Sequence, residues 1–242
     1  MSHSFIYKKK KSLSNNECFN LIKAFEADRE FSGPGMVGGE QGTHENPEIK
    51  KSTDISFNPA FETHPIWGPI LNPVITAVAK GMADYERYNW MAMDCLAAIQ
   101  MNPIFNMQRF YPGEAYHQMH CERGSTQFPY RTHAWMIYLN DIKEGGQTEF
   151  PLQNLLEIPE LGKLLIWPAD FTHIHRGLVA PNETKYLLTG WLSFVDDTKE
   201  IKEMKPFDWE NDWDGDKEAF YPEKRPEKNE KGYKISSEFN KH

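Results

Sequence analysis

The sequence has few cysteines and no long apolar run, and each shortage argues against a class of protein. Its three cysteines, Cys18, Cys95 and Cys121, are an odd number at unrelated spacings, which indicates free thiols in a reducing compartment rather than a disulfide framework or a zinc ribbon. No apolar stretch is long enough to span a bilayer, and the first residues, MSHSFIYKKKKSL, lack the apolar core of a signal peptide. We therefore expect a cytoplasmic protein that is not embedded in a membrane.

Clustered positive charge is also missing. The chain carries 27 Lys and Arg against 35 Asp and Glu, a formal net charge of −8, and its basic residues are scattered. Because nucleic-acid binding requires a clustered basic face, we expect no nucleic-acid partner. Hydrophobic residues make up 39% of the 242, which suffices for one sizeable core, so the sequence predicts a single domain with extensions.

Two amphipathic helices are predicted in the first hundred residues. Residues 13–28 open with a capping box of Ser14 and Glu17 and continue with apolar residues at helical spacing. Residues 69–89 carry an apolar stripe that indicates a helix covering a sheet, formed by Ile70, Val74, Val78 and Met82. Residues 32–48 are rich in Gly and Pro without periodicity, so we expect a long surface loop there, either a mobile flap or a passive connector.

Short β-rich runs separated by turns follow from residue 98 onward, among them NMQRFY, AWMIYLND, KLLIWP and KYLLTGWLSFV. This pattern predicts an all-β core of seven or eight strands. We expect residues 1–97 to form a helical support region of the same domain, residues 98–196 the core, and residues 197–242 a charged extension that packs partly on the core through aromatic residues. Those aromatic residues are Trp209, Trp213, Phe220 and Tyr221.

The stretch YHQMHCERG places metal-binding side chains close together in the sequence. Residues two apart in a β-strand point to the same face, so His120 and Glu122 are expected to project together, whereas His117 faces the other way. A third ligand is required, and WPADFTHIHRG offers His173 and His175, which again share a face by spacing. Periodicity does not choose between them.

Two imidazoles and one carboxylate form a facial triad, which leaves half of the coordination sphere open and suits iron(II) in oxygen chemistry. A structural zinc site normally has four protein ligands, and Cys121, predicted to point away from His120, is poorly placed to be one. The residues therefore favour an open iron site over structural zinc.

Five short motifs follow one another in residues 98–195. They are His120-Cys121-Glu122, Tyr138-Leu139-Asn140-Asp141, Gly145-Gly146-Gln147-Thr148-Glu149-Phe150-Pro151, His175-Arg176-Gly177, and Lys185 with Trp191. In this order and at these spacings they closely resemble the iron(II)- and 2-oxoglutarate-dependent oxygenases of the prolyl 4-hydroxylase type. The chain departs from the family pattern in two places, since Glu122 replaces the usual Asp and one extra residue separates Tyr116 from His120.

The resemblance implies a role for each matching residue. Only His175 has Lys185 ten positions later and Trp191 sixteen positions later, so the resemblance makes His175 the distal iron ligand. His120 and Glu122 complete the metal-binding and catalytic set, and Lys185 is the cation for the far carboxylate of 2-oxoglutarate. Further cofactor-binding positions are Tyr111, Tyr138 and Thr148, and candidates for the substrate cleft are Arg131 and Trp191.

A turn predicted at APNE, residues 180–183, gives Lys185 an independent argument. The turn would fold the strand with Lys185 back along the strand with His175. A symmetric hairpin would then set Lys185 opposite about residue 178, roughly 10 Å along the strand from His175.

The resemblance further implies a mainly β fold, a double-stranded β-helix or cupin-like jelly roll with the N-terminal helices packed on one sheet. It implies an oxidoreductase, a dioxygenase that uses iron(II), 2-oxoglutarate and O2, with ascorbate as reductant, to hydroxylate an unactivated C–H bond. The favoured substrate is a prolyl residue in a peptide or protein, as for procollagen-proline 4-dioxygenase. The alternatives are a free amino acid, another side chain or a small metabolite as substrate, a catalytically silent jelly-roll binding module, and a zinc hydrolase.

Overall fold

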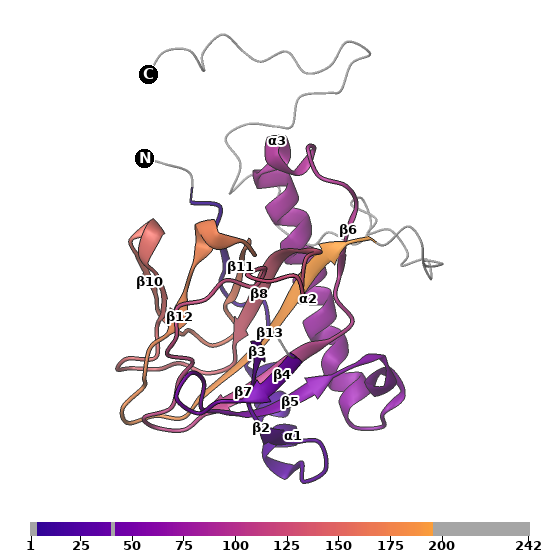
Figure 1. Ribbon diagram of the computed structural model, residues 1–242. Coiled ribbons are helices and arrows are strands. Elements are labelled where there is room, and N and C mark those ends of the chain that lie inside the picture. The colour runs from indigo at the N-terminus through magenta and orange to yellow at the C-terminus, as the bar shows by residue number, and fades with distance from the viewer. Residues whose placement is uncertain (1–3, 40–41, 196–242) are drawn as a thin grey trace, which may run out of the picture.

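An antiparallel sheet forms the centre of the protein, with helices on one face and a smaller sheet on the other (Figure 1). The computed structural model describes residues 4–39 and 42–195. The main sheet runs in the order β1 (Tyr7–Lys9), β11 (Leu164–Pro168), β8 (Arg131–Tyr138), β13 (Lys185–Phe194), β7 (Phe105–Phe110), β5 (Thr53–Phe57) and β2 (Gly33–Pro34), and β6 (Ile99–Met101) pairs with the end of β13. The smaller sheet contains β10 (Leu155–Glu157), β9 (Thr148–Phe150) and β12 (Arg176–Gly177).

Strand alternation divides the core into two layers. On β8, Trp135 and Ile137 pack with the helices, whereas Met136 and Tyr138 pack with residues of the smaller sheet. Each side of the main sheet is thus covered by a different partner. The predicted mainly β jelly roll, with N-terminal helices on one sheet, is confirmed.

Helix α1 (Asn15–Ala27) begins with the predicted capping box. The Ser14 hydroxyl accepts a hydrogen bond from the Glu17 backbone N–H at 3.3 Å, and the Glu17 carboxylate accepts one from the Ser14 backbone N–H at 2.7 Å. Cys18, Leu21 and Phe25 are buried, which fixes the helix face that meets the core.

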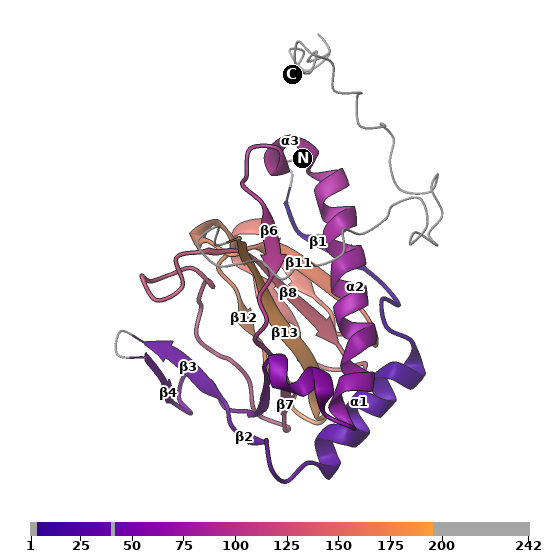
Figure 2. The same ribbon diagram turned by 90° about the vertical axis from the view of Figure 1, so that its right-hand side faces the viewer.

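Helix α2 (Trp67–Tyr88) covers the main sheet as predicted, but its buried stripe is rotated (Figure 2). The outer members of the predicted stripe, Ile70 and Met82, are only partly buried, and Leu71 and Gly81 are buried in their place. A Cβ at Gly81 would lie 2.2 Å from the side chain of Leu164 on β11, so this glycine lets helix and sheet approach closely. The remaining helical turns are α3 (Trp90–Met93), η1 (Pro59–Thr63), η2 (Pro151–Gln153) and η3 (Phe171–His173).

Residues 32–48 are not the irregular loop that the sequence predicts. Met36–Gly39 (β3) and Gly42–Glu45 (β4) pair as an antiparallel hairpin, and β2 joins the main sheet beside β5. The prediction was wrong because it treated glycine only as a breaker, whereas Gly42, with φ +108°, supplies a conformation that a tight hairpin needs. Figure 2 shows this hairpin on the side of the main sheet away from α2.

The predicted hairpin between the strands of His175 and Lys185 is also wrong. Lys185 begins β13 in the main sheet and pairs with Phe110 of β7, whereas β12 lies in the smaller sheet. Both edges of β13 are occupied, by β7 and β8, so residues 178–184 cross from one sheet to the other.

Residues 1–97 contribute β1, β2 and β5 to the main sheet as well as the helices, so this region is not purely helical. The predicted boundaries at residues 97 and 196 stay predictions. The extension 197–242, with the partial packing predicted for its aromatic residues, lies outside the described residues. Within the described part of the chain, no helix has both the length and the apolar composition needed to cross a bilayer.

Candidate metal centre

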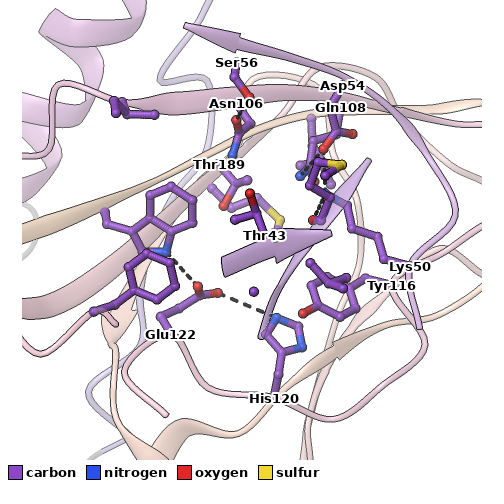
Figure 3. A pocket seen from close by; sticks show the side chains of 18 of the residues that line it. Thr43, Lys50, Asp54, Ser56, Asn106, Gln108, Tyr116, His120, Glu122 and Thr189 are labelled. Atoms are coloured by element: carbon purple, nitrogen blue, oxygen red, sulfur yellow. Dashed lines mark hydrogen bonds and ion pairs between the residues drawn. The ribbon is translucent and has the colours of Figure 1, made fainter. Parts of the chain in front are cut away.

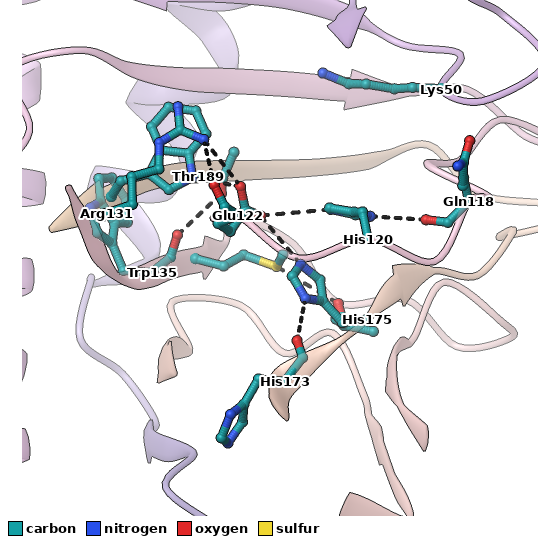
Figure 4. A network of polar contacts seen from close by, with 12 residues as sticks. Lys50, Gln118, His120, Glu122, Arg131, Trp135, His173, His175 and Thr189 are labelled. Atoms are coloured by element: carbon teal, nitrogen blue, oxygen red, sulfur yellow. Dashed lines mark hydrogen bonds and ion pairs between the residues drawn. The ribbon is translucent and has the colours of Figure 1, made fainter. Parts of the chain in front are cut away.

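Side chains from two separate segments meet in the barrel. His120 and Glu122 precede β8, and His175 directly precedes β12. Their ligand atoms lie within 4.8 Å of one another, with Glu122 Oε1 3.6 Å from His120 Nε2 and 3.4 Å from His175 Nε2 (Figure 4). Nitrogen and oxygen ligands lie roughly 2 Å from a bound divalent metal, so atoms at these separations can share one ion.

The backbone at this site is not the regular strand that the sequence predicts. His120 forms an isolated bridge with His175, in which each backbone N–H donates to the other residue's carbonyl at 3.0 and 2.9 Å. Glu122 lies in a turn. The argument from strand faces was therefore wrong in its premise, although the side chains do converge. The bridge brings the two segments together.

Hydrogen bonds orient both imidazoles. His120 Nδ1 lies 2.9 Å from the Gln118 carbonyl oxygen, and His175 Nδ1 lies 3.0 Å from that of His173 (Figure 4). A carbonyl only accepts, so each Nδ1 carries the proton and each Nε2 presents its lone pair. This is the tautomer in which Nε2 binds a metal.

The electrostatics favour an ionised carboxylate and a neutral imidazole. Burial raises the pKa of the Glu122 carboxyl, but its interactions with the neighbouring His120 and His175 outweigh burial and hold that pKa well below its ordinary value. Burial lowers the pKa of His175, and the neighbouring His120 lowers it further. Both residues are therefore held in the protonation state that metal binding requires.

His173 and His117 do not join this group. His173 ends η3, where its Nε2 lies 2.8 Å from the Ser4 carbonyl oxygen and its Nδ1 lies 2.8 Å from the Thr172 hydroxyl. His117 is exposed at the surface. The structure thus brings together the three residues predicted as ligands and leaves these two histidines outside.

The three candidate ligands line a cavity of about 1180 Å³. Residues of the main sheet, the smaller sheet and the β3–β4 hairpin enclose it. Figure 3 shows Thr43 of β4, with Asn106 and Thr189 of the main sheet, among the side chains around this space. The cavity has ample room for a cofactor and part of a substrate beside a metal.

Lys185 lies in the same cavity and is only 2% exposed. Its Nζ donates to the carbonyl oxygens of Gly146 and Leu178 at 3.0 and 3.4 Å and lies 5.1 Å from the centre of the Phe110 ring. Within residues 4–39 and 42–195 no carboxylate pairs with it. Burial lowers the pKa of Lys185 to about 8. A buried cation in this state fits an anionic group that enters the cavity.

Thr148 and Tyr138 lie one behind the other beside the cavity. Thr148 lines the cavity, and the Tyr138 hydroxyl is 2.6 Å from Thr148 Oγ1. Tyr138 is fully buried and is absent from the residues that line the cavity. Burial raises the pKa of its hydroxyl, which therefore stays protonated. Tyr138 can orient Thr148 without touching a ligand.

Tyr111 is not brought to the cavity. It is 46% exposed, and the Arg109 guanidinium lies 4.3 Å from the centre of its ring. Phe110 lies next to Lys185 instead, because β7 turns Phe110 and Gln108 into the barrel and Arg109 away from it. The alternation of inward and outward residues along β7 would have predicted Phe110, rather than Tyr111, as the residue that faces the cavity.

Arg131 and Trp191, predicted for the substrate cleft, surround the Glu122 carboxylate. Trp191 Nε1 donates to Glu122 Oε2 at 2.6 Å, and Arg131 Nη1 lies 3.6 Å from the same oxygen. The guanidinium lies between the rings of Phe128 and Trp191, at 3.7 and 3.6 Å from their centres. Both residues line the cavity, so they contact a candidate ligand and the open space together.

Two further residues of the site were missed by sequence reasoning. The Tyr116 ring stacks on the His120 imidazole at 3.8 Å with an angle of 10° between the rings. Lys50 forms a backbone bridge with Tyr116 and lines the cavity, where it is paired with Asp54. Tyr116 carried a signal, since it lies in the same short stretch as His120. The sequence gives no signal for Lys50, because its position in the cavity depends on a backbone bridge between distant segments.

Two imidazoles and a carboxylate in a jelly roll, with an open cavity beside them, define a protein of the facial-triad class. The donor set fits iron(II), because the imidazole lone pairs and the carboxylate converge while the remaining side of the site faces open space.

Comparisons with known proteins agree with this class. Residues 105–193 match the family model described as the 2OG-Fe(II) oxygenase superfamily, and this match confirms the resemblance predicted from the motifs. No curated protein matches the sequence significantly.

Several solved structures are similar to this chain. The viral collagen prolyl hydroxylase vCPH from Paramecium Bursaria Chlorella virus-1, in its 2OG complex, gives a TM-score of 0.58 at 18% identity, covering 79% of this chain and 97% of that chain. A prolyl hydroxylase from Trichoplax adhaerens, in complex with a hypoxia inducible factor oxygen degradation domain peptide fragment, gives 0.63 at 14% identity, covering 78% and 84%. A prolyl-4-hydroxylase from Pseudomonas putida gives 0.55 at 13% identity, covering 80% and 94%. At these identities the likeness establishes the fold.

Proposed function

We propose that the protein is an iron(II)- and 2-oxoglutarate-dependent dioxygenase that hydroxylates a prolyl residue in a peptide or protein. One observation carries the proposal. The three converging ligands face a single cavity together with the buried Lys185, which has no carboxylate partner among the described residues, and this gives a metal-chelating keto acid an attachment point at each of its ends.

Each residue has a defined task in this proposal. His120, Glu122 and His175 would hold iron(II), which, when bound, supplies the chemistry that couples O2 and 2-oxoglutarate to C–H oxidation. Lys185 binds the far carboxylate of 2-oxoglutarate, and Thr148 offers a hydroxyl in the same cavity. Lys185 is almost fully buried, and a charged contact in such a site is stronger than the same contact in water.

The prolyl substrate is supported by likeness alone. Prolyl hydroxylases recur among the similar solved structures, and the Trichoplax adhaerens protein is named as a complex with a peptide. A proline-rich peptide is already extended in solution, so a cleft can bind it with little ordering cost. Ascorbate as reductant, a cytoplasmic location, and an oxygenase core at residues 98–196 belong to the same proposal.

The test is oxygen-dependent turnover. The protein is incubated with iron(II), 2-oxoglutarate, ascorbate and a set of proline-rich peptides, and succinate and peptide mass are measured. We expect succinate together with a gain of one oxygen at a prolyl residue. Turnover of free proline or a metabolite, with none of the peptides, would support the alternative substrates. Metal and 2-oxoglutarate binding without turnover of any candidate would favour a silent binding module.

Alanine variants test the distal ligand separately from the substrate. His175→Ala should abolish metal binding, because it removes one of the three convergent ligands. His173→Ala is the matched control two positions away, since its ring faces Ser4 and Thr172. Loss of metal binding in His173→Ala but not in His175→Ala would contradict the assignment.

A further inference from the structure

The two oxygens of the Glu122 carboxylate face different partners. Oε1 lies 3.6 and 3.4 Å from the Nε2 atoms of His120 and His175, whereas Oε2 accepts a hydrogen bond from Trp191 Nε1 at 2.6 Å. Trp191 lies in β13, 69 residues from Glu122, so the contact depends on the register of the main sheet. One oxygen is thus directed to the metal site and the other is held away from it.

This division matters because of the length of the side chain. Glu122 replaces the family's usual Asp, and its extra methylene gives the carboxylate more freedom to rotate. If both oxygens bound the metal, the second would occupy a coordination position that the co-substrate or O2 needs. A facial triad works only while half of the sphere stays open.

We propose that Trp191 is a positioning residue that restricts Glu122 to metal binding through Oε1 alone and so keeps a position open for 2-oxoglutarate. This inference rests on the proposed metal role of the triad. It also explains how the chain uses the longer carboxylate, because the extra methylene lets Oε2 reach the indole N–H while Oε1 faces the imidazoles.

Arg131 supports the same arrangement from the other side. Its Nη1 lies 3.6 Å from Glu122 Oε2 and donates to the Glu122 backbone carbonyl at 3.3 Å. Its guanidinium stacks on the Trp191 ring and on the Phe128 ring, which fixes the plane of the indole. The hydrogen bond from Trp191 therefore comes from a donor that is itself immobilised.

The test uses cobalt(II) as an air-stable probe of the iron site. Calorimetry measures cobalt binding to the metal-free protein and then 2-oxoglutarate binding to the cobalt-loaded protein, for the parent and for Trp191→Phe. We expect the 2-oxoglutarate affinity to fall roughly 10–100-fold, because the freed Oε2 then competes for the position that the co-substrate needs, and losing an outer partner of a metal ligand typically lowers metal affinity or activity by such a factor. Cobalt affinity should change by less than about threefold, which is smaller than the roughly 10–100-fold loss typical when an outer partner is removed, because the freed Oε2 becomes an additional donor to the metal.

Trp135→Phe is the matched control. It makes the same chemical change at a fully buried indole whose Nε1 has no hydrogen-bond partner among the described residues. Trp135 packs with the helices on the other side of the main sheet, so we expect a lower melting temperature and unchanged affinities. A loss of 2-oxoglutarate affinity equal to that of Trp191→Phe would overturn the proposal, because general loosening would then explain both.

A double-mutant cycle with Glu122→Asp tests whether Trp191 positions the carboxylate or only lines the cavity. Aspartate is one methylene shorter, so its second oxygen falls about 1.5 Å short of the indole. In that background Trp191→Phe should change 2-oxoglutarate affinity by less than about threefold. The inference is contradicted if Trp191→Phe lowers 2-oxoglutarate affinity as much in the Glu122→Asp background as in the parent, or if it does not lower it in the parent. Failure of the parent itself to bind cobalt would instead count against the proposed function.

Discussion

Lys50 and Lys185 are two buried lysines that line the same cavity, yet their surroundings differ. Lys50 is 4% exposed and its Nζ lies 2.5 Å from Asp54 Oδ2, an oxygen that also accepts a hydrogen bond from Gln108 at 3.3 Å. Lys185 is 2% exposed and, among the described residues, donates to two backbone carbonyls. One cation is compensated within the protein, and the other has no opposite charge among the described residues.

The difference distinguishes a structural cation from a binding cation. The lowering of the Lys185 pKa from 10.5 to about 8 means that burial disfavours its charged form by roughly 3 kcal/mol, since one pKa unit corresponds to about 1.4 kcal/mol. A ligand carboxylate at Lys185 would relieve this cost. A ligand carboxylate at Lys50 would have to displace Asp54.

The largest expected effect follows from removing the binding cation. Lys185→Met keeps the length of the side chain and removes its charge, which leaves the far carboxylate of 2-oxoglutarate buried without a partner. Breaking such a pair costs about 3–5 kcal/mol, so we expect 2-oxoglutarate affinity to fall on the order of a hundredfold to a few thousandfold. Calorimetry on the anaerobic, iron-loaded protein measures it. Lys185→Arg should recover part of the loss, and a change below about threefold in Lys185→Met would remove Lys185 from the co-substrate site.

Removing the structural cation should instead destabilise the fold. Lys50→Met leaves Asp54 buried without its counter-ion, and we expect the free energy of unfolding to fall by about 3 kcal/mol. Asp54 keeps its hydrogen bonds from Ser52 and Gln108, which limits the loss. Denaturant unfolding provides the measurement. The double variant Lys50→Met/Asp54→Leu should return to within about 1 kcal/mol of the parent, and no recovery would mean that the pair is not the cause.

The contrast between the two lysines also marks what sequence can predict. Lys185 was found because a motif fixes its spacing from His175, and the structure places it in the cavity even though the predicted hairpin between them does not exist. Lys50 carries no such spacing. Its burial depends on the bridge to Tyr116, which joins segments whose pairing no local pattern encodes.

The same limit applies to the backbone of the site. Strand periodicity predicted that His120 and Glu122 share a face, but a turn and an isolated bridge produce their convergence. Local strand alternation would have predicted that Phe110, and not Tyr111, faces the cavity, because this prediction needs only the sequence of the strand that contains Phe110. The bond from Trp191 to Glu122 requires the register of the whole main sheet, which sequence does not supply.

A smaller effect, of opposite sign to that of Lys50→Met, is expected for the stability of the ligand-free protein. Near neutral pH, Lys185 is a buried charge with no counter-ion in residues 4–39 and 42–195, so Lys185→Met should raise the free energy of unfolding by about 1–3 kcal/mol. Thermal unfolding of metal-free protein without 2-oxoglutarate tests this. A variant less stable than the parent would show that Lys185 is already compensated.

The smallest effect is a pH dependence of 2-oxoglutarate affinity and of stability that arises from the titration of Lys185. Because its pKa in the folded protein is about 8, the side chain is cationic below that pH and loses its proton above it. The cationic form binds 2-oxoglutarate, so affinity should be level below about pH 8 and fall by up to about tenfold per pH unit above it, until the higher pKa of the complex is reached.

The stability of the ligand-free protein should change in the opposite direction. The pKa is lower in the folded than in the unfolded chain, so the cost of the buried charge is present below about pH 8 and is relieved as the pH rises toward 10.5. Calorimetric titrations across this range, with Lys185→Met as the control whose profile should be flat, distinguish Lys185 from other titrating groups. If the affinity of the parent stays level well above pH 8, Lys185 remains charged in the ligand-free cavity. The charge of Lys185 would then be compensated like that of Lys50, and the difference between the two lysines would be contradicted.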